Sequence, residues 1–223
     1  MHAQLRIDFV SDVSCPWCAI GLKSLEAALD QVKVQVQADI HFQPFELNPN
    51  MSPEGQDLRE HLVAKYGLSP DQYRQNTEAL RLRGEQVGII FTDQRSRIYN
   101  TFDAHRLLHW ADLEGRQREL QRALFQAYFT HGQDPSAHET LLDLAVQAGL
   151  DVIRARDILA SDEYAQAVHE REHFYLEQGI HAVPSIIINE RHLIQGGQPA
   201  EVFAHTLRKI AAEQTSGEIS PQK

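Results

Sequence analysis

Cysteine, methionine and long apolar runs are scarce in this chain. Its 223 residues include two cysteines and two methionines, and nowhere do the roughly 18 consecutive apolar residues of a membrane-spanning helix occur. The N-terminal residues Met1–Asp8 also lack the apolar core of a signal peptide. We therefore expect the protein to be cytoplasmic. Thiols are normally reduced in the cytoplasm, so we expect no permanent structural disulfide between the two cysteines. A bridge that opens and closes during a reaction stays compatible with this composition.

Basic residues are also few. The chain has 21 lysines and arginines against 31 aspartates and glutamates, and its net charge of −10 repels nucleic acids and anionic membrane surfaces. We therefore expect no nucleic-acid partner and no membrane partner. The hydrophobic content of 42% is enough to fill a core, and the length fits one large domain or a core domain with an insertion.

The N-terminal part carries the pattern of a β-α-β unit. Apolar and polar residues alternate over Gln4–Val10 and again over 34–42, which predicts two strands. Between them, leucines recur at helical spacing over Cys15–Leu29. Pro16 is compatible with the first turn of this helix, because an N–H at that position would have no partner.

Strand patterns vanish from 52 to 179 and return afterwards. Within that block we expect helices near 70–84, 101–112, 120–130, 138–148, 152–159 and 162–178. Apolar runs at 186–188 and 192–195 predict a strand pair, and a last helix follows Pro199. This order predicts an α/β protein with a thioredoxin-like fold split by an all-helical insertion. The expected parts are a thioredoxin-like domain (1–51 and 180–214), the helical insertion (52–179) and a flexible tail (215–223).

Both cysteines lie in the stretch SCPWCAIG, Ser14–Gly21, at the start of the first predicted helix. Unpaired N–H groups and the positive end of the helix dipole point at Cys15, so we expect its pKa to fall and Cys15 to be the attacking thiolate. Cys18 lies one turn further along, within bonding reach, and is expected to resolve a mixed disulfide. Pro16 and Trp17 are expected to tune the pair, because they determine how many amides reach Cys15 and how dry its surroundings are.

Five segments together resemble the DsbA family of thiol:disulfide oxidoreductases, and specifically its FrnE-like cytoplasmic branch. They are DVSCPWCAIG (12–21), FELNPNM (45–51), NTFDAHRLLHWA (100–111), GIHAVP (179–184) and GGQPAE (196–201). The resemblance implies a protein disulfide oxidoreductase or isomerase with an oxidising poise, acting on protein thiols and disulfides or small thiols as a monomer or homodimer. It implies no metal and no organic cofactor, with glutathione as a candidate reductant or ligand. Two departures from the family pattern are Ala182, usually glycine, and Ala19, often aromatic.

The same resemblance assigns roles around the cysteines. It implies that Pro184 is cis and faces the CxxC pair, and that the backbone of Val183 pairs with a substrate chain. Phe45 is a candidate for the border of the site by family analogy. His181 either adds positive charge near the thiols or faces solvent. Aromatic residues of the helical block are expected in the core: Tyr66, Trp110, Phe125, Tyr128 and Phe129.

Three alternatives compete with this interpretation. Histidines four apart, His105 with His109 and His169 with His173, leave a Cys₂His₂ metal site open by count, and 169–173 matches HExxH literally. No third zinc ligand follows at a recognisable spacing, so a solvated helix face is favoured over a peptidase.

The second alternative is a glutathione-dependent isomerase or transferase, similar to 2-hydroxychromene-2-carboxylate isomerases and kappa glutathione transferases, with Asn48 and the backbone of Val183 as glutathione contacts. Serine is typical at the first motif position there, which argues against it. The third is a holdase with incidental thiols.

Overall fold

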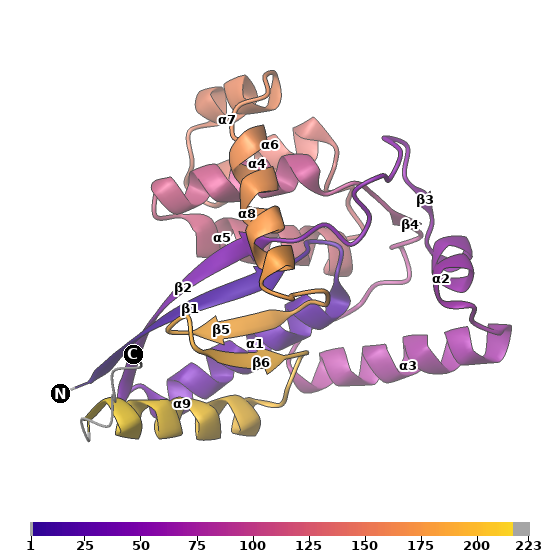
Figure 1. The fold of residues 1–223 in the computed structure, drawn as a ribbon. Coiled ribbons are helices and arrows are strands. Elements are labelled where there is room, and N and C mark those ends of the chain that lie inside the picture. The colour runs from indigo at the N-terminus through magenta and orange to yellow at the C-terminus, as the bar shows by residue number, and fades with distance from the viewer. Residues whose placement is uncertain (1, 216–223) are drawn as a thin grey trace.

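The computed structural model describes residues 2–215 and contains a four-stranded mixed sheet (Figure 1). The strand order is β2-β1-β5-β6, with β1 parallel to β2 and the other two pairs antiparallel. The strands are β1 (Ala3–Ser11), β2 (Val36–Pro44), β5 (Ser185–Ile188) and β6 (His192–Gln195). The predicted strands are confirmed, although β2 lies two residues further along the chain than the alternation indicated.

Two helices cover one face of this sheet, and the helices of residues 102–177 lie on the other side (Figure 1). They are α1 (Pro16–Val32) and α9 (Ala200–Thr215). Their apolar faces and the inward residues of β1 form one core, in which Phe9, Leu25 and Phe203 are fully buried. Burial of each such side chain contributes about 1.5–3 kcal/mol relative to exposure. This core therefore holds the start of α1 against the sheet.

A second core lies within the helical block and includes Leu107, Leu124 and Leu144. The elements of this block are α4 (Phe102–Leu113), α5 (Gln117–Phe125), the π-helix η1 (Gln126–Thr130), α6 (His138–Gln147), α7 (Val152–Leu159) and α8 (Ala165–Glu177). Helices α4, α5 and α8 also contact β2, the outer strand of the sheet. These helices agree with the predicted ranges to within a few residues, because each buries an apolar stripe that the sequence displays.

The insertion is not all-helical, so that prediction was wrong. A two-stranded antiparallel sheet, β3 (Gln56–Asp57) with β4 (Arg97–Ile98), lies within it, next to α2 (Leu58–Tyr66) and α3 (Pro70–Gln86). Two-residue strands are too short to show an alternating pattern. Helix α2 was not predicted because Leu58 is its one buried residue, so it lacks an apolar stripe. Its local signals are the N-cap Asp57, whose side chain accepts from the N–H of Glu60, and the stop at Gly67, with φ +63°.

Four of the five aromatic residues expected in the core are buried: Trp110, Phe125, Tyr128 and Phe129. Tyr66 is 58% exposed, so its assignment to the core was wrong. The reason is that α2 contacts α3 and the small sheet and does not join the second core. The division into domains stays a prediction, and the tail expected at 215–223 lies outside the described residues except for Thr215, which ends α9. Within residues 2–215, no helix is both long and apolar enough to cross a bilayer.

Candidate active site

The first cysteine is the N-cap residue of α1. Cys15 has an extended backbone (φ −88°, ψ 111°), and Pro16 is the first helical residue. The N–H groups of Cys18 and Ala19 donate to the carbonyl oxygen of Cys15, at 3.0 and 3.4 Å. Cys15 therefore lies at the open, positive end of the helix, while Cys18 lies inside the first turn.

The loop before β5 brings a second segment to the same place. The Val183–Pro184 peptide bond is cis, and the Cys15 thiol donates to the carbonyl oxygen of Val183 at 3.7 Å. Glycine permits this close approach of α1 and the two loops. A Cβ on Gly21 would lie 3.1 Å from Cγ of Pro184, and one on Gly197 would lie 2.9 Å from the carbonyl oxygen of Trp17. The two glycines thus explain why the AIG and GGQ sequences accompany the CxxC pair.

The two thiols have different environments. Cys18 is completely inaccessible, and burial together with the neighbouring Cys15 raises the pKa of its thiol well above the ordinary value. Cys15 is 4% exposed, and both thiols are free in the described structure. Trp17, between them in sequence, is 44% exposed. The arrangement therefore keeps Cys18 protonated and leaves Cys15, at the helix end, as the sulfur that a substrate can approach first.

A buried ion pair lies beside the cysteines. The carboxylate of Asp12 accepts hydrogen bonds from the N–H groups of Ser14, at 2.9 Å, and Leu47, at 2.6 Å. His105 Nε2 from α4 lies 3.9 Å from Asp12 Oδ1, which is an ion-pair distance and too long for a hydrogen bond. Burial would raise the pKa of Asp12, but His105 and the two N–H groups outweigh it and lower that pKa. Asp12 is therefore an ionised group in the interior, and its charge contributes to the raised pKa of Cys18.

The other predicted site residues lie at varied positions. Phe45 is partly buried and packs, as Val183 does, against the small apolar cluster of Val10, Tyr175 and Ile180. Asn48 accepts a hydrogen bond from Lys65 Nζ at 2.8 Å. His181 is exposed to solvent, which agrees with the expectation that it faces solvent.

Two features near the site were not expected from the sequence. Tyr66 lies close enough to Cys15 for the sulfur's charge, after burial, to raise the pKa of the phenol. A cavity of about 470 Å³ opens beside the end of β2, where its lining includes Leu47, Asn48, Met51 and His61. No local sequence pattern predicts either feature, because both depend on how α2 packs against the segment that follows β2.

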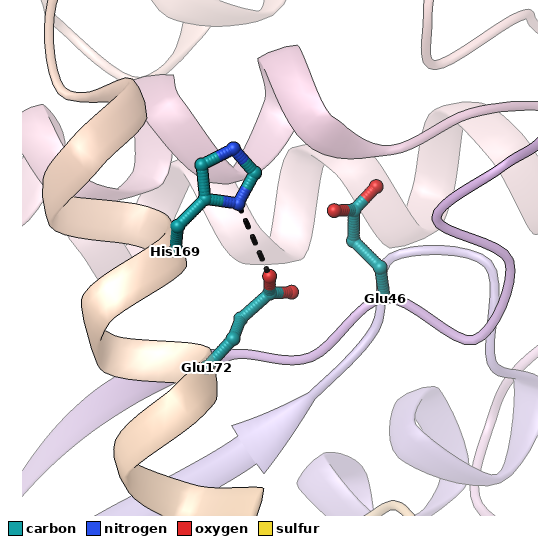
Figure 2. Close-up of side chains that lie close together, drawn as sticks. All are labelled: Glu46, His169 and Glu172. Carbon is teal, nitrogen blue, oxygen red and sulfur yellow. Dashed lines mark ion pairs between the residues drawn. The ribbon is translucent and has the colours of Figure 1, made fainter.

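The histidine pairs do not form the zinc sites considered above. His105 faces Asp12, whereas His109 packs against the ring of Tyr164. His173 pairs with Glu177 at 3.1 Å. Among residues 2–215, the one group of three or more potential metal ligands whose atoms all lie close together is Glu46, His169 and Glu172, with no cysteine (Figure 2). The HExxH interpretation and the Cys₂His₂ interpretation therefore have no support in this part of the chain.

Burial is the main cause that raises the pKa of Glu46 to about 7, and the negative charge of Glu172 adds to this effect. Burial also raises the pKa of Glu172. The segment of Glu46 contacts the Asp12–His105 pair, because the N–H of Leu47 donates to Asp12. The charges of Glu172 and Glu46 help to raise the pKa of His105.

Comparisons with known proteins agree with this architecture. A probable DsbA oxidoreductase from Streptomyces coelicolor is 32% identical, with a TM-score of 0.87 over 98% of this chain and 93% of that chain. The uncharacterized protein YwbO of Bacillus subtilis (strain 168) is 28% identical over 202 residues, 89% of this chain and 94% of its own. The cytosolic disulfide reductase DsbM from Pseudomonas aeruginosa, solved with GSH, shares the fold at 16% identity and a TM-score of 0.61, over 95% and 98% of the two chains.

The family model described as a DSBA-like thioredoxin domain matches residues 6–208, which run from the first strand into the last helix and include both cysteines and the cis-proline loop. With nearly the whole chain matched in this way, the protein belongs to the DsbA-like family of thiol-disulfide oxidoreductases.

Proposed function

We propose that this protein catalyses thiol–disulfide exchange through Cys15 and Cys18. The observation that carries the proposal is the asymmetry of the pair, with Cys15 at the helix N-cap against Val183 and Cys18 fully buried one turn further. The Cys15 thiolate attacks a substrate disulfide, forms a mixed disulfide and releases one substrate thiolate. Cys18, as a thiolate, then attacks Cys15 Sγ, closes the Cys15–Cys18 bond and releases the second substrate thiolate. The substrate gains two electrons, and the reverse sequence oxidises a dithiol.

The second attack requires Cys18 to lose its proton in the interior. Burial raises its pKa, so a nearby acceptor must take the proton as the sulfur attacks. The negative charge of Asp12 opposes ionisation of Cys18, and His105 offsets that charge. We therefore propose that the Asp12–His105 pair controls how readily Cys18 loses its proton.

Substrate approach is restricted, because Cys15 is almost covered. The carbonyl of Val183 lies against its thiol and can accept a hydrogen bond from a passing main chain. Trp17, two residues further along the chain, is exposed, and so is Tyr66, whose phenol the charge of Cys15 influences. A flexible peptide segment or a small disulfide reaches such a sulfur more easily than a rigid protein surface does. Protein thiols and disulfides in extended segments, and small thiols, are therefore the proposed partners.

Glutathione is the second candidate ligand. The cavity beside Asn48 has polar side chains in its lining, among them Asn50, Gln56 and His61, and the related fold of DsbM was solved with GSH. Here glutathione would act as the reductant that reopens the Cys15–Cys18 bond, so no separate cofactor is required. Isomerisation of a small molecule by bound glutathione is the less favoured reading, because the first motif position is Cys15 and not the serine typical of those enzymes.

The test compares insulin reduction and refolding of oxidised ribonuclease by the wild type, Cys15→Ser and Cys18→Ser. We expect Cys15→Ser to be inactive, because no attacking thiolate remains. Cys18→Ser should accumulate a mixed disulfide visible by mass spectrometry, because its resolving thiol is missing. Full activity in Cys15→Ser would overturn the proposal and favour glutathione-dependent isomerisation or a holdase role for the chain.

A further inference from the structure

We propose that Glu46, His169 and Glu172 bind one divalent transition-metal ion, with Zn²⁺ the best match to the donor set. The site is separate from the cysteine pair and does not depend on thiol–disulfide exchange. Figure 2 shows the three side chains converging from two elements, helix α8 and the segment that follows β2.

The geometry is that of three ligands around a common point. His169 and Glu172 lie three residues apart on α8, so they share one face of the helix, and His169 Nδ1 lies 3.9 Å from Glu172 Oε2. One ligand atom from each of the three residues lies within 4.8 Å of the others. Zinc ligands bound at about 2.0–2.2 Å lie roughly 3.4 Å apart in a tetrahedron, so small rotations of two glutamate side chains close the site.

The imidazole is already oriented for ligation. The ring of His169 stacks on the ring of Phe102, with centroids 4.6 Å apart and planes 20° apart. This contact restricts the ring while Nδ1 faces the two carboxylates, as Figure 2 shows. One nitrogen and two oxygen donors are compatible with zinc, and a fourth position is left for water.

An unpartnered buried carboxylate oxygen supplies an independent observation. Oε1 of Glu172 is buried and has no hydrogen-bond partner among residues 2–215. Buried polar atoms normally have partners, so this oxygen of the cluster indicates a missing ligand.

The local charge also favours a cation. Glu46 and Glu172 bring two carboxyl groups together, and among residues 2–215 neither of them forms an ion pair with a lysine or an arginine. A dication would therefore neutralise carboxylates that the described chain leaves poorly compensated.

The test measures Zn²⁺ binding by isothermal titration calorimetry on the full-length, tag-free chain. All proteins carry Cys15→Ser and Cys18→Ser, so neither thiol can ligate the metal and the result is independent of the redox proposal. The variants are His169→Ala and Glu46→Gln. The matched control is His173→Ala, because His173 is exposed on the same helix and pairs with Glu177 outside the cluster.

We expect one Zn²⁺ per chain in the parent and in His173→Ala, and affinity weakened about tenfold or more in the other two variants. Co²⁺ should give visible absorption of a tetrahedral site with no thiolate charge-transfer band, and His169→Ala should abolish it. His169 is exposed, so this variant decides the question even if Glu46→Gln does not fold. Absence of saturable binding in the parent, or equal affinity in His169→Ala and the parent, would overturn the proposal.

Discussion

Replacing Asp12 by asparagine tests the buried pair on which the proposed resolving step depends. Asn keeps the shape of the side chain but has one acceptor oxygen, whereas the Asp12 carboxylate accepts from both Ser14 and Leu47. The amide NH₂ would have to face one of these N–H groups, donor against donor. The substitution also leaves the imidazole of His105 buried without its counter-charge.

The expected loss of stability is large. A buried N–H left without an acceptor costs about 1–3 kcal/mol, and removing one partner of a buried ion pair costs about 3–5 kcal/mol in total. Because Asp12 is fully buried, solvent screens little of this interaction. We therefore expect Asp12→Asn to lower the free energy of unfolding by about 3–5 kcal/mol at pH 6.

The effect should depend on pH with a definite sign. The pKa of Asp12 is lowered on folding, so its contribution is present above the ordinary value of 3.8 and is lost as pH falls through the folded value. The pKa of His105 is raised by Asp12, Glu172 and Glu46 against the effect of burial. Its contribution is therefore present below 6.5 and is lost as pH rises through the folded value. The difference in the free energy of unfolding between wild type and Asp12→Asn should be largest between pH 3.8 and pH 6.5. It should become smaller at alkaline pH.

The assay is urea unfolding of the wild type, Asp12→Asn, His105→Gln and the double variant, at pH 6 and pH 8.5 with a chelator present. The four unfolding free energies form a double-mutant cycle, and we expect a coupling energy of about 1–3 kcal/mol at pH 6. A total loss below about 1 kcal/mol in Asp12→Asn, or no coupling with His105, would refute the reasoning.

Two further substitutions test how the site and its support are packed. Gly197→Ala places a Cβ 2.9 Å from the carbonyl oxygen of Trp17. We expect urea unfolding to show a loss of about 1–3 kcal/mol in the free energy of unfolding, and we expect slower thiol–disulfide exchange. Unchanged stability would show that the loop moves aside without cost. Arg106→Met removes a buried guanidinium that donates to the carbonyl oxygens of Ile158, Ser161 and Glu163. We expect a loss of at least about 3 kcal/mol, and a change within 1 kcal/mol would contradict this role.

The elements that carry the cysteines were predictable from local patterns. The alternation in β1, the leucine spacing of α1 and the position of Pro16 are properties of neighbouring residues, and each is satisfied within one element. The resemblance added the cis peptide before Pro184, which no periodicity indicates. Helix α2 was not predicted because it has no apolar stripe. The assignment of Tyr66 to the core was wrong because the sequence does not show where that helix packs.

The sequence by itself determined that a CxxC pair begins a helix after the first strand, because strand alternation, helix spacing and first-turn proline act between near neighbours in the chain. Tertiary structure alone decided that Asp12 meets His105, and that Glu46 meets His169 and Glu172. These groups come from separate segments, and their approach depends on how α4 and α8 pack against β2. The packing of these helices depends on many contacts across the whole fold, so no short stretch of the sequence predicts it.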